Sequence, residues 1–170
     1  DGSTVTISDW KKEGWGTLTY DQGFALSSNI AVANIVESVI TKVDLKSCYA
    51  KYGFGKATGF SLKREDKGNI DYKYQIEAAT AGYGQGITTT PMQHIQALTA
   101  IANDGVMLRP YVVDKITLSN SKKSVYTGKR MVVGTVASSD TISKMKELMK
   151  SVITGDETNS TGYAYYMDGY

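Results

Sequence analysis

The stretch ALSSNI, residues 25–30, places two hydroxyls and a carboxamide directly before a run of apolar residues. A serine hydroxyl both donates and accepts hydrogen bonds, and an asparagine amide offers two N–H donors and a carbonyl acceptor on a short side chain. Ser27, Ser28 and Asn29 could therefore face a substrate. Serine is also a preferred helix cap, and the apolar spacing that follows predicts a helix that Ser27 or Ser28 would cap. Both interpretations stay open at this point.

Other residues that often carry chemistry are scarce. His94 is the only histidine, so a Ser-His-Asp triad or a multi-histidine metal site has little to draw on. We interpret His94 as a surface or half-buried structural residue. Cys48 has no cysteine partner, and we interpret it as a packing residue and not as a nucleophile. No cofactor and no metal is predicted.

Two further patterns are weak. The glycines of GYGQG, residues 82–86, resemble a phosphate-binding loop only loosely, because the Lys-Ser/Thr ending of a P-loop is missing. The charged run at residues 63–67 predicts a solvated loop. Across the chain, 19 basic and 17 acidic residues give a formal charge of +2 without a basic block, so no nucleic-acid partner is expected.

The elements that would position these residues follow from periodicity, caps and breakers. The first 20 residues predict short extended pieces and turns, and a helix is expected over residues 27–41. A short polar helix containing Cys48 follows, and then a loop over residues 55–75. Thr90 and Pro91 predict the start of another helix, which Gly105 ends. Strands of an antiparallel hairpin or meander are expected within residues 109–118, 122–128 and 130–136, and a last helix over 139–153.

The same periodicity predicts which helix faces are buried. In the helix that begins at Pro91, Gln93 and Gln96 are expected near solvent, and the buried face is Ile95, Leu98, Ile101 and Ala102. The last helix, capped by Ser138 or Ser139, is expected to bury Ile142, Met145, Leu148, Met149 and Val152. At 170 residues the chain has the length of one domain, and the order of helices, strands and helix predicts an α+β fold.

Three longer stretches resemble one protein family. GTLTYDQGFALSSNIAVANIVE (16–37) is similar to the region around the Ser-x-Asn motif of class B penicillin-binding proteins. YGFGKATGFSLKRED (52–66) resembles the segment that follows, and AGYGQGITTTPMQHIQALTAIANDGVMLRPYVV (81–113) is similar to the longest signature of that family. In these serine acyltransferases a Ser-x-x-Lys, a Ser-x-Asn and a Lys-Thr-Gly element converge on one cleft. The resemblance implies the penicillin-binding transpeptidase fold, with helices packed on an antiparallel sheet.

Two of the three family motifs are not matched. Ser8-Asp9-Trp10-Lys11 spells Ser-x-x-Lys, but Gly14 and Gly16 follow, so no helix is expected and Ser8 is not taken as the nucleophile. No Lys-Thr-Gly or Lys-Ser-Gly occurs. We therefore expect residues 1–170 to be a partial transpeptidase domain, without a nucleophile and inactive alone. An apolar surface should be exposed where the missing segments would pack.

The resemblance assigns roles to individual residues. Ser27 would be the bridging hydroxyl that relays a proton, and Asn29 would bond the substrate's amide carbonyl, while Ser28 faces away and serves the helix. Gln85 is a candidate substrate contact, although its structural interpretation is to turn the chain into the helix at Pro91.

The activity implied is peptidoglycan cross-linking by a serine D,D-transpeptidase, with a lean towards division or sporulation enzymes over elongation ones. The implied partners are peptidoglycan stem peptides, β-lactam antibiotics and other cell-wall synthesis proteins. The implied location is the extracytoplasmic face of a bacterial membrane, with an N-terminal anchor segment absent from this chain. Two alternatives stay open: a β-lactam-hydrolysing or β-lactam-sensing relative, and a non-catalytic scaffold of wall synthesis.

Overall fold

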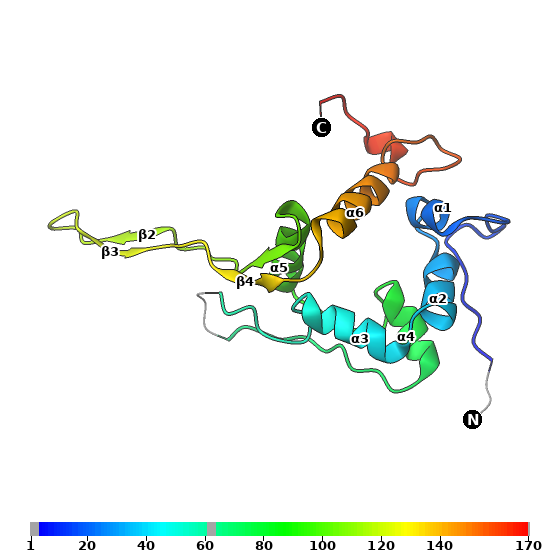
Figure 1. Ribbon diagram of the computed structural model, residues 1–170, viewed down its shortest axis with the longest axis horizontal. Helices are drawn as coiled ribbons and strands as arrows, with labels where there is room; N and C mark the ends of the chain where they lie inside the picture. Colours follow the sequence, from blue (N-terminus) through cyan, green and yellow to red (C-terminus); the bar gives the residue numbers. More distant parts are fainter. Residues whose placement is uncertain (1–3, 61–63, 170) are drawn as a thin grey trace. The chain divides into compact units, whose positions relative to one another are not determined.

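The computed structural model describes residues 4–60 and 64–169, whose contacts divide them into two units (Figure 1). Unit 1 holds the residues up to 47, then 71–87, and those from 143 onward. Unit 2 holds residues 48–70 and 88–142. The helices α3 (Lys42–Lys51) and α6 (Ser139–Ser151) each have residues in both units. Among the described residues, no helix combines the length and the apolar character that crossing a membrane requires.

Unit 1 is built on close helix packing. Helix α2 (Asn29–Ser38) contacts α1 (Tyr20–Ala25) and α4 (Gln75–Gly82), and the short 3₁₀ helix η1 (Tyr163–Tyr165) lies near the end of the chain. A methyl group on Gly23 would lie 2.4 Å from Ala31 Cβ, and one on Gly82 would lie 2.7 Å from Val36 Cγ2. These two glycines therefore allow α1 and α4 to approach α2 more closely than any side chain would. The core of this packing includes Ala33, Val36, Ala78, Ala79 and Ala81.

Unit 2 places a helix on a small sheet. Helix α5 (Pro91–Ala102) packs against β1 (Val106–Leu108), which pairs antiparallel with β4 (Val132–Thr135). Ala100, Met107 and Val136 form the core cluster of this contact, and Tyr52 packs against it. Gly105 makes the tight connection from α5 to β1: its φ is +94°, and its N–H donates to Ala100 O at 2.7 Å. The predicted stop of the helix at Gly105 is confirmed.

The second sheet of unit 2 is a two-stranded hairpin of β2 (Lys115–Thr117) and β3 (Ser124–Thr127). The prediction of an antiparallel hairpin is confirmed for these two strands. The meander is wrong, because β4 pairs with β1 and not with β3. Strand β1 has only three residues and follows directly on the turn at Gly105, so it is too short to show an alternating pattern. Helices α1 and α4 were not predicted either, since each has fewer than nine residues.

The helix at Pro91 is confirmed, but the prediction of its buried face is wrong. Ile95 and Leu98 are 50% and 52% exposed, whereas Gln93 and Gln96 are buried. The reason is hydrogen bonding: the Gln93 amide donates to the carbonyl oxygens of Lys56 and Lys67, both at 2.8 Å. These carbonyls belong to a loop. The Gln93 side chain can be buried against them because its amide N–H groups satisfy their need for hydrogen-bond donors. The apolar surface expected where the missing family segments would pack stays a prediction.

Helix α6 also differs in part from its prediction. Ser138 caps it, accepting a hydrogen bond from Thr141 N at 3.2 Å, and Ile142 is buried as expected. Met149 is 39% exposed, and Met145, Leu148 and Val152 are only partly buried. The predicted loop over residues 55–75 is confirmed for its described residues, apart from the first residue of α4. Lys63 of the charged run lies outside the described residues.

Candidate functional site

At the start of α2, the two serines of the Ser-Ser-Asn stretch have different roles. Ser28 is the N-cap, and its Oγ accepts from Ala31 N at 3.0 Å. The same hydroxyl donates to the Asp9 carboxylate, at 3.1 and 3.0 Å from its two oxygens, and Ile30 N–H donates to Asp9 Oδ1 at 3.1 Å. A carboxylate here also faces the positive end of the helix dipole. Ser28 is buried, as its predicted service to the helix requires.

Ser27 does not cap the helix, and its surroundings differ from those of Ser28. It is exposed, its φ is +53°, and its hydroxyl has no hydrogen-bond partner among the described residues. A residue other than glycine in the left-handed region is uncommon and costs free energy, so the surroundings must hold it there. The backbone supplies that restraint, because Ser27 N donates to Phe24 O at 3.0 Å and Ser28 N donates to Gly23 O at 2.8 Å. The cap is therefore Ser28, and the Ser27 hydroxyl stays available.

Asn29, the first residue of α2, is held on one side only. Its Nδ2 donates to Ser8 O at 3.1 Å, and the side chain is half-buried. Nearby, Trp10 Nε1 donates to Leu26 O at 3.3 Å. Residues 8–10 thus hold residues 26–30 through side chains and backbone together. The Asn29 carbonyl oxygen has no partner among the described residues, so it and the second N–H can bond another molecule.

Ser27 and Asn29 line one hollow of unit 1, with a volume of about 310 Å³. One wall comes from far along the chain: Thr161 N and Thr161 Oγ1 both donate to Ala25 O, at 3.1 and 3.2 Å, and Gly162 N donates to Val152 O at 2.8 Å. The sequence pattern of residues 154–170 gave no sign of this wall. The hollow is lined by Gly23, Phe24, Ser27, Ser28, Asn29, Val32, Tyr83, Val152 and Thr161.

Gln85 does not share this hollow. It is exposed, and its backbone N–H donates to Thr80 O at 3.0 Å, which continues the turn after α4. Tyr83, two residues earlier, lines the hollow instead. The Tyr83 side chain was missed by sequence reasoning, because α4 itself was not predicted. Further on, Thr88 pairs with Asn69, and Thr90 caps α5, which confirms its predicted place at the start of that helix.

The remaining candidates have structural surroundings. Residues 4–19 contain no helix, as the glycines predicted, so Ser8 and Lys11 are not one turn of a helix apart. His94 is exposed, its Nε2 lies 2.8 Å from Thr89 Oγ1, and its ring meets Phe54 edge-on. Cys48 is exposed, so the packing prediction is wrong. No group of three His, Cys, Asp or Glu within residues 4–60 and 64–169 could hold a metal ion.

The hollow can hold a polar group, but its lining offers no obvious base. Apart from the Tyr83 phenol, its side chains do not ionise in the usual pH range. The Ser27 hydroxyl can pass a proton between two other groups, and the Asn29 amide can bond a carbonyl. Asp9 is occupied by Ser28 and Ile30 N–H. A serine nucleophile here would need a base from elsewhere.

Comparison with known sequences gives one family. The sequence model described as "Penicillin binding protein transpeptidase domain" matches residues 1–170. The chain is 29% identical over 168 residues to Stage V sporulation protein D of Bacillus subtilis, with 95% of this chain and 25% of that protein covered. It is 38% identical over 142 residues to Penicillin-binding protein 2B of Streptococcus pneumoniae, covering 70% of this chain and 20% of the relative. The chain thus spans about a quarter or less of the length of these relatives.

Solved structures agree with the sequence comparison. Penicillin Binding Protein 2X from Streptococcus thermophilus superposes with a TM-score of 0.80 at 29% identity, covering 91% of this chain and 23% of that one. Penicillin-binding protein 2B from Streptococcus pneumoniae strain 5204 gives 0.79 at 24% identity, over 96% of this chain and 31% of that one. The α+β fold expected from the sequence is that of these transpeptidase domains. With the family match along its whole length, the chain belongs to the penicillin-binding protein transpeptidase domain family.

Proposed function

We propose that this chain contributes the Ser-x-Asn part of the active site of a peptidoglycan D,D-transpeptidase. The family match supports acyl transfer in cell-wall synthesis, and a 30% identical relative, over 125 residues, is named Peptidoglycan D,D-transpeptidase MrdA in Escherichia coli. The reaction would be attack of a serine hydroxyl on the carbonyl between the last two D-alanines of a stem peptide, which forms an acyl-enzyme ester, breaks the amide bond and releases the terminal D-alanine with its nitrogen protonated. An amino group of a second stem would then resolve the acyl-enzyme.

One observation carries the assignment of residues. Ser28 and Asp9 take over the capping of α2, while Ser27 keeps a free hydroxyl in a strained backbone conformation at the hollow. A serine needed only as a cap would not require the second hydroxyl. Strain of this kind is tolerated where the surroundings over-determine it, and it often occurs at functional sites.

The roles follow from the chemistry of the two side chains. Ser27 relays the proton between the nucleophile, its lysine base and the leaving nitrogen, since a hydroxyl both donates and accepts. Asn29 holds the amide carbonyl of the stem peptide with the N–H that Ser8 O leaves unused. The acylated serine with its lysine, and the Lys-Thr-Gly strand, are proposed to come from parts of a transpeptidase outside these 170 residues. Gln85 is not retained as a substrate contact in this proposal.

The same proposal extends to ligands and location. β-Lactams, which imitate the D-Ala-D-Ala end, would occupy the completed cleft, and a relative named Penicillin-binding protein 2B supports this. A peptidoglycan substrate requires the extracytoplasmic side of the bacterial membrane. Other wall-synthesis proteins are proposed as partners on the same ground.

The test is acylation of the full-length product of the gene that encodes these residues. A fluorescent penicillin is the probe, and the rate constant of acylation is measured for Ser27→Ala and Asn29→Ala. Each should fall about a hundredfold or more, the usual effect of removing one proton-relay or carbonyl-binding group. Ser47→Ala is the matched control, since Ser47 is exposed on α3. Ser28→Ala is unsuitable as a control, because that hydroxyl is buried and bonded to Asp9.

The outcomes separate the two parts of the proposal. Near-normal acylation of both variants, with intact circular dichroism, would remove Ser27 and Asn29 from the site. A parental protein that is not acylated at all would contradict the transpeptidase proposal and support a non-catalytic scaffold. The isolated 170-residue chain is expected to remain unlabelled, and a stoichiometric adduct on it would contradict the proposed division of the site.

A further inference from the structure

The hairpin of β2 and β3 leaves strand edges without partners. The sheet holds only these two strands within the described part of the chain, so each strand has one edge whose backbone N–H and C=O groups face no other strand. All seven residues of the two strands are exposed. A two-stranded hairpin by itself is at best marginally stable in water, and a third strand or a packed face is the usual remedy. Figure 1 shows this hairpin as an extended arm of unit 2.

The charge of the hairpin region differs from that of the remaining chain. Residues 109–131 contain one acidic residue, Asp114, and six basic ones, which gives a formal charge of +5. Since the whole chain carries +2, the other residues together carry −3. The excess is not visible as a block in the sequence, because the cations are spread over 23 residues. The basic residues are Arg109, Lys115, Lys122, Lys123, Lys129 and Arg130.

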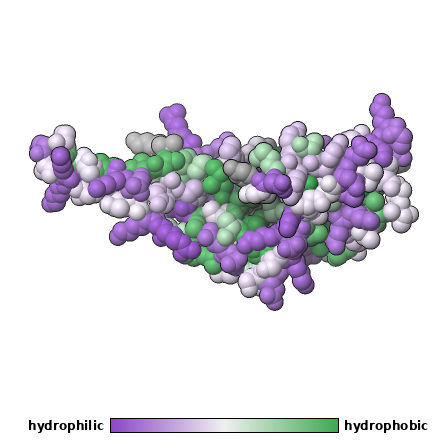
Figure 2. Space-filling model, turned by 90° about the horizontal axis from the view of Figure 1, so that it is seen from above, coloured by the Kyte–Doolittle hydropathy of each residue, from purple (hydrophilic) through white to green (hydrophobic). Residues whose placement is uncertain are grey.

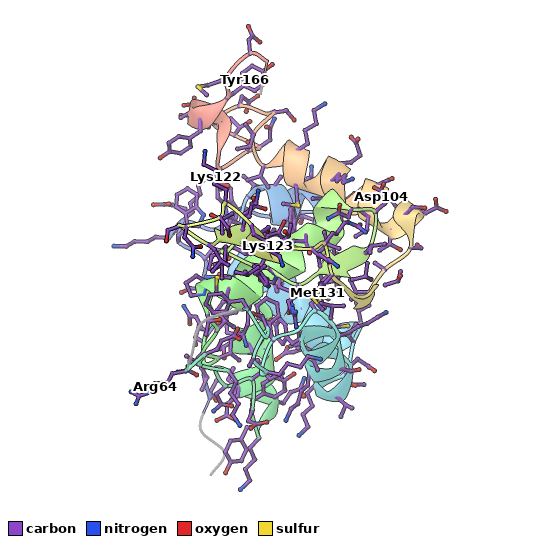
Figure 3. All side chains as sticks on the ribbon, turned by 90° about the vertical axis from the view of Figure 1, so that its left-hand side faces the viewer. Arg64, Asp104, Lys122, Lys123, Met131 and Tyr166 are labelled. Atoms are coloured by element: carbon purple, nitrogen blue, oxygen red, sulfur yellow. The ribbon has the colours of Figure 1, made fainter. Side chains whose placement is uncertain are left out.

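Apolar side chains accompany these cations. Ile116 and Tyr126 are paired across the two strands, and both are substantially exposed, as are Leu118 and Val125. Figure 2 shows hydrophobic residues along this arm beside hydrophilic ones. Figure 3 labels Lys122 and Lys123, which belong to the turn of the hairpin, and Met131 at its base. Exposed apolar groups beside like charges indicate a surface that binds a partner of opposite charge.

A hollow of about 440 Å³ lies along β3 at the base of the hairpin. Val125, Tyr126 and Thr127 form one side, and Arg109 and Lys129 bring two cations to it. Tyr111 is fixed close to the backbone, since a methyl group on Gly128 would lie 2.6 Å from its ring. Gly128 N–H donates to Asp114 O at 2.6 Å, towards β2. Because backbone groups alternate along a strand, the N–H of Thr127 points to the free edge.

We propose that the β3 edge is a docking site for an extended acidic segment of a partner protein, which adds as a third strand. Main-chain hydrogen bonds to β3 provide the affinity, and side chains in the hollow provide selectivity. Carboxylates of the segment pair with Arg109 and Lys129, and alternate apolar side chains contact Tyr111 and Tyr126. A strand is favoured over an anionic membrane surface because only a polypeptide uses the unpaired edge. This site is independent of residues 27–29.

Fluorescence anisotropy with synthetic peptides tests the proposal on the full-length product of the gene that encodes these residues. The probe is a labelled seven-residue peptide of alternating Glu and Val. It should bind saturably, and its affinity should fall as salt is raised from about 0.05 to 0.3 M, because exposed charges are screened. Arg109→Glu/Lys129→Glu should weaken binding at least tenfold. Lys12→Glu/Lys51→Glu is the matched control, since it changes the net charge equally at exposed positions outside the hairpin.

Two further probes decide the mode of binding. The same peptide N-methylated at alternate amides keeps its carboxylates but cannot complete a ladder, and it should bind at least tenfold more weakly. A Lys/Val peptide should not bind. Equal binding of the methylated peptide, or equal losses in both charge-reversal variants, would overturn the strand-addition proposal. Binding to phosphatidylglycerol vesicles without binding of the Glu/Val peptide would overturn it in favour of a membrane surface. Circular dichroism establishes that each variant is folded.

Discussion

Helices α2 and α5 both begin at a hydroxyl cap, but the support for the two caps comes from different distances along the chain. At α2, the carboxylate of Asp9 holds the Ser28 hydroxyl from 19 residues upstream. At α5, Thr90 and Gln93 satisfy each other's backbone N–H groups, and Gln93 then reaches two loop carbonyls. A local pattern thus predicts where a helix begins. The side chains used at that start decide which face is buried.

The largest effect on the free energy of unfolding is expected at Gln93. Gln93→Leu removes the two donors to Lys56 O and Lys67 O and the acceptor for Thr90 N, so buried backbone groups lose their partners. The free energy of unfolding should fall by about 2–5 kcal/mol. Urea denaturation followed by circular dichroism measures it.

Leu98→Ala is the contrasting variant on the same helix. Leu98 is 52% exposed, so its truncation should cost less than about 1 kcal/mol, well below the usual cost for a buried leucine. If Leu98→Ala destabilises the protein more than Gln93→Leu, then Leu98 is buried in solution. The assignment of Gln93 and Gln96 to the buried face of α5 would then be wrong.

The next effect is expected at Asp9. Asp9→Ala removes the acceptor for Ser28 Oγ and Ile30 N–H, and should cost about 1–3 kcal/mol, because hydrogen bonds to a charged group are stronger than neutral ones. Glu37→Ala, an exposed carboxylate of the same helix, is the control and should change stability little. Hydrogen exchange of the Ile30 amide should accelerate in Asp9→Ala only. Unchanged protection would show that Asp9 does not hold the start of α2.

Glu77 at the start of α4 and Gln93 at the start of α5 both accept a backbone N–H three residues earlier, but only Glu77 is charged. The stabilisation by Glu77 should therefore depend on pH, and that by Gln93 should not. At α4, Glu77 accepts from Tyr74 N at 2.8 Å and Lys73 N at 2.6 Å, and these bonds lower the pKa of Glu77 below its ordinary value of 4.5. Because the pKa of Glu77 is lower in the folded state, the ionised carboxylate stabilises the fold at pH values above its ordinary pKa. This stabilisation is lost as the pH falls through the pKa of the folded state.

Glu77→Gln should therefore lower the urea midpoint near pH 7, and the gap to the parental protein should close as the pH falls from about 5 to 3. The gap for Gln93→Leu should not close in this way, since an amide does not titrate. A Glu77→Gln gap that stays constant over this range would show that the carboxylate charge is irrelevant at α4.

The sequence was sufficient for the elements with local signals. Ser28, Thr90, Ser138 and Gly105 each act through neighbours within a few residues, so the starts of α2, α5 and α6 and the end of α5 were predictable. The family resemblance identified the Ser-Ser-Asn stretch. Neither source predicted the pairing of β4 with β1, which joins residues such as Val106 and Thr135 that are far apart in the sequence.

The surroundings of the candidate site depend on contacts far along the chain. Thr161 reaches Ala25 across 136 residues, and Tyr83 reaches the hollow at the end of a helix too short to show a period. The family resemblance makes Gln85 a candidate contact, yet the turn after α4 leaves it exposed and outside the hollow. The burial of Gln93 was missed because periodicity counts apolar residues and ignores carbonyls that need a donor.

The smallest effect on stability is expected at Ser27, where a substitution should reduce acylation and leave the fold almost unchanged. Glycine adopts a φ near +53° without the steric cost that serine bears, although it also makes the unfolded chain more flexible. The two terms largely cancel, so Ser27→Gly should leave the free energy of unfolding within about 1 kcal/mol of the parental value. Ser28→Gly instead removes a buried hydroxyl bonded to Asp9, and should destabilise the protein clearly more. Acylation of the full-length protein by fluorescent penicillin should nevertheless fall strongly in Ser27→Gly. A Ser27→Gly variant that loses as much stability as Ser28→Gly would mean that the Ser27 hydroxyl is engaged in the fold and is not free for a substrate.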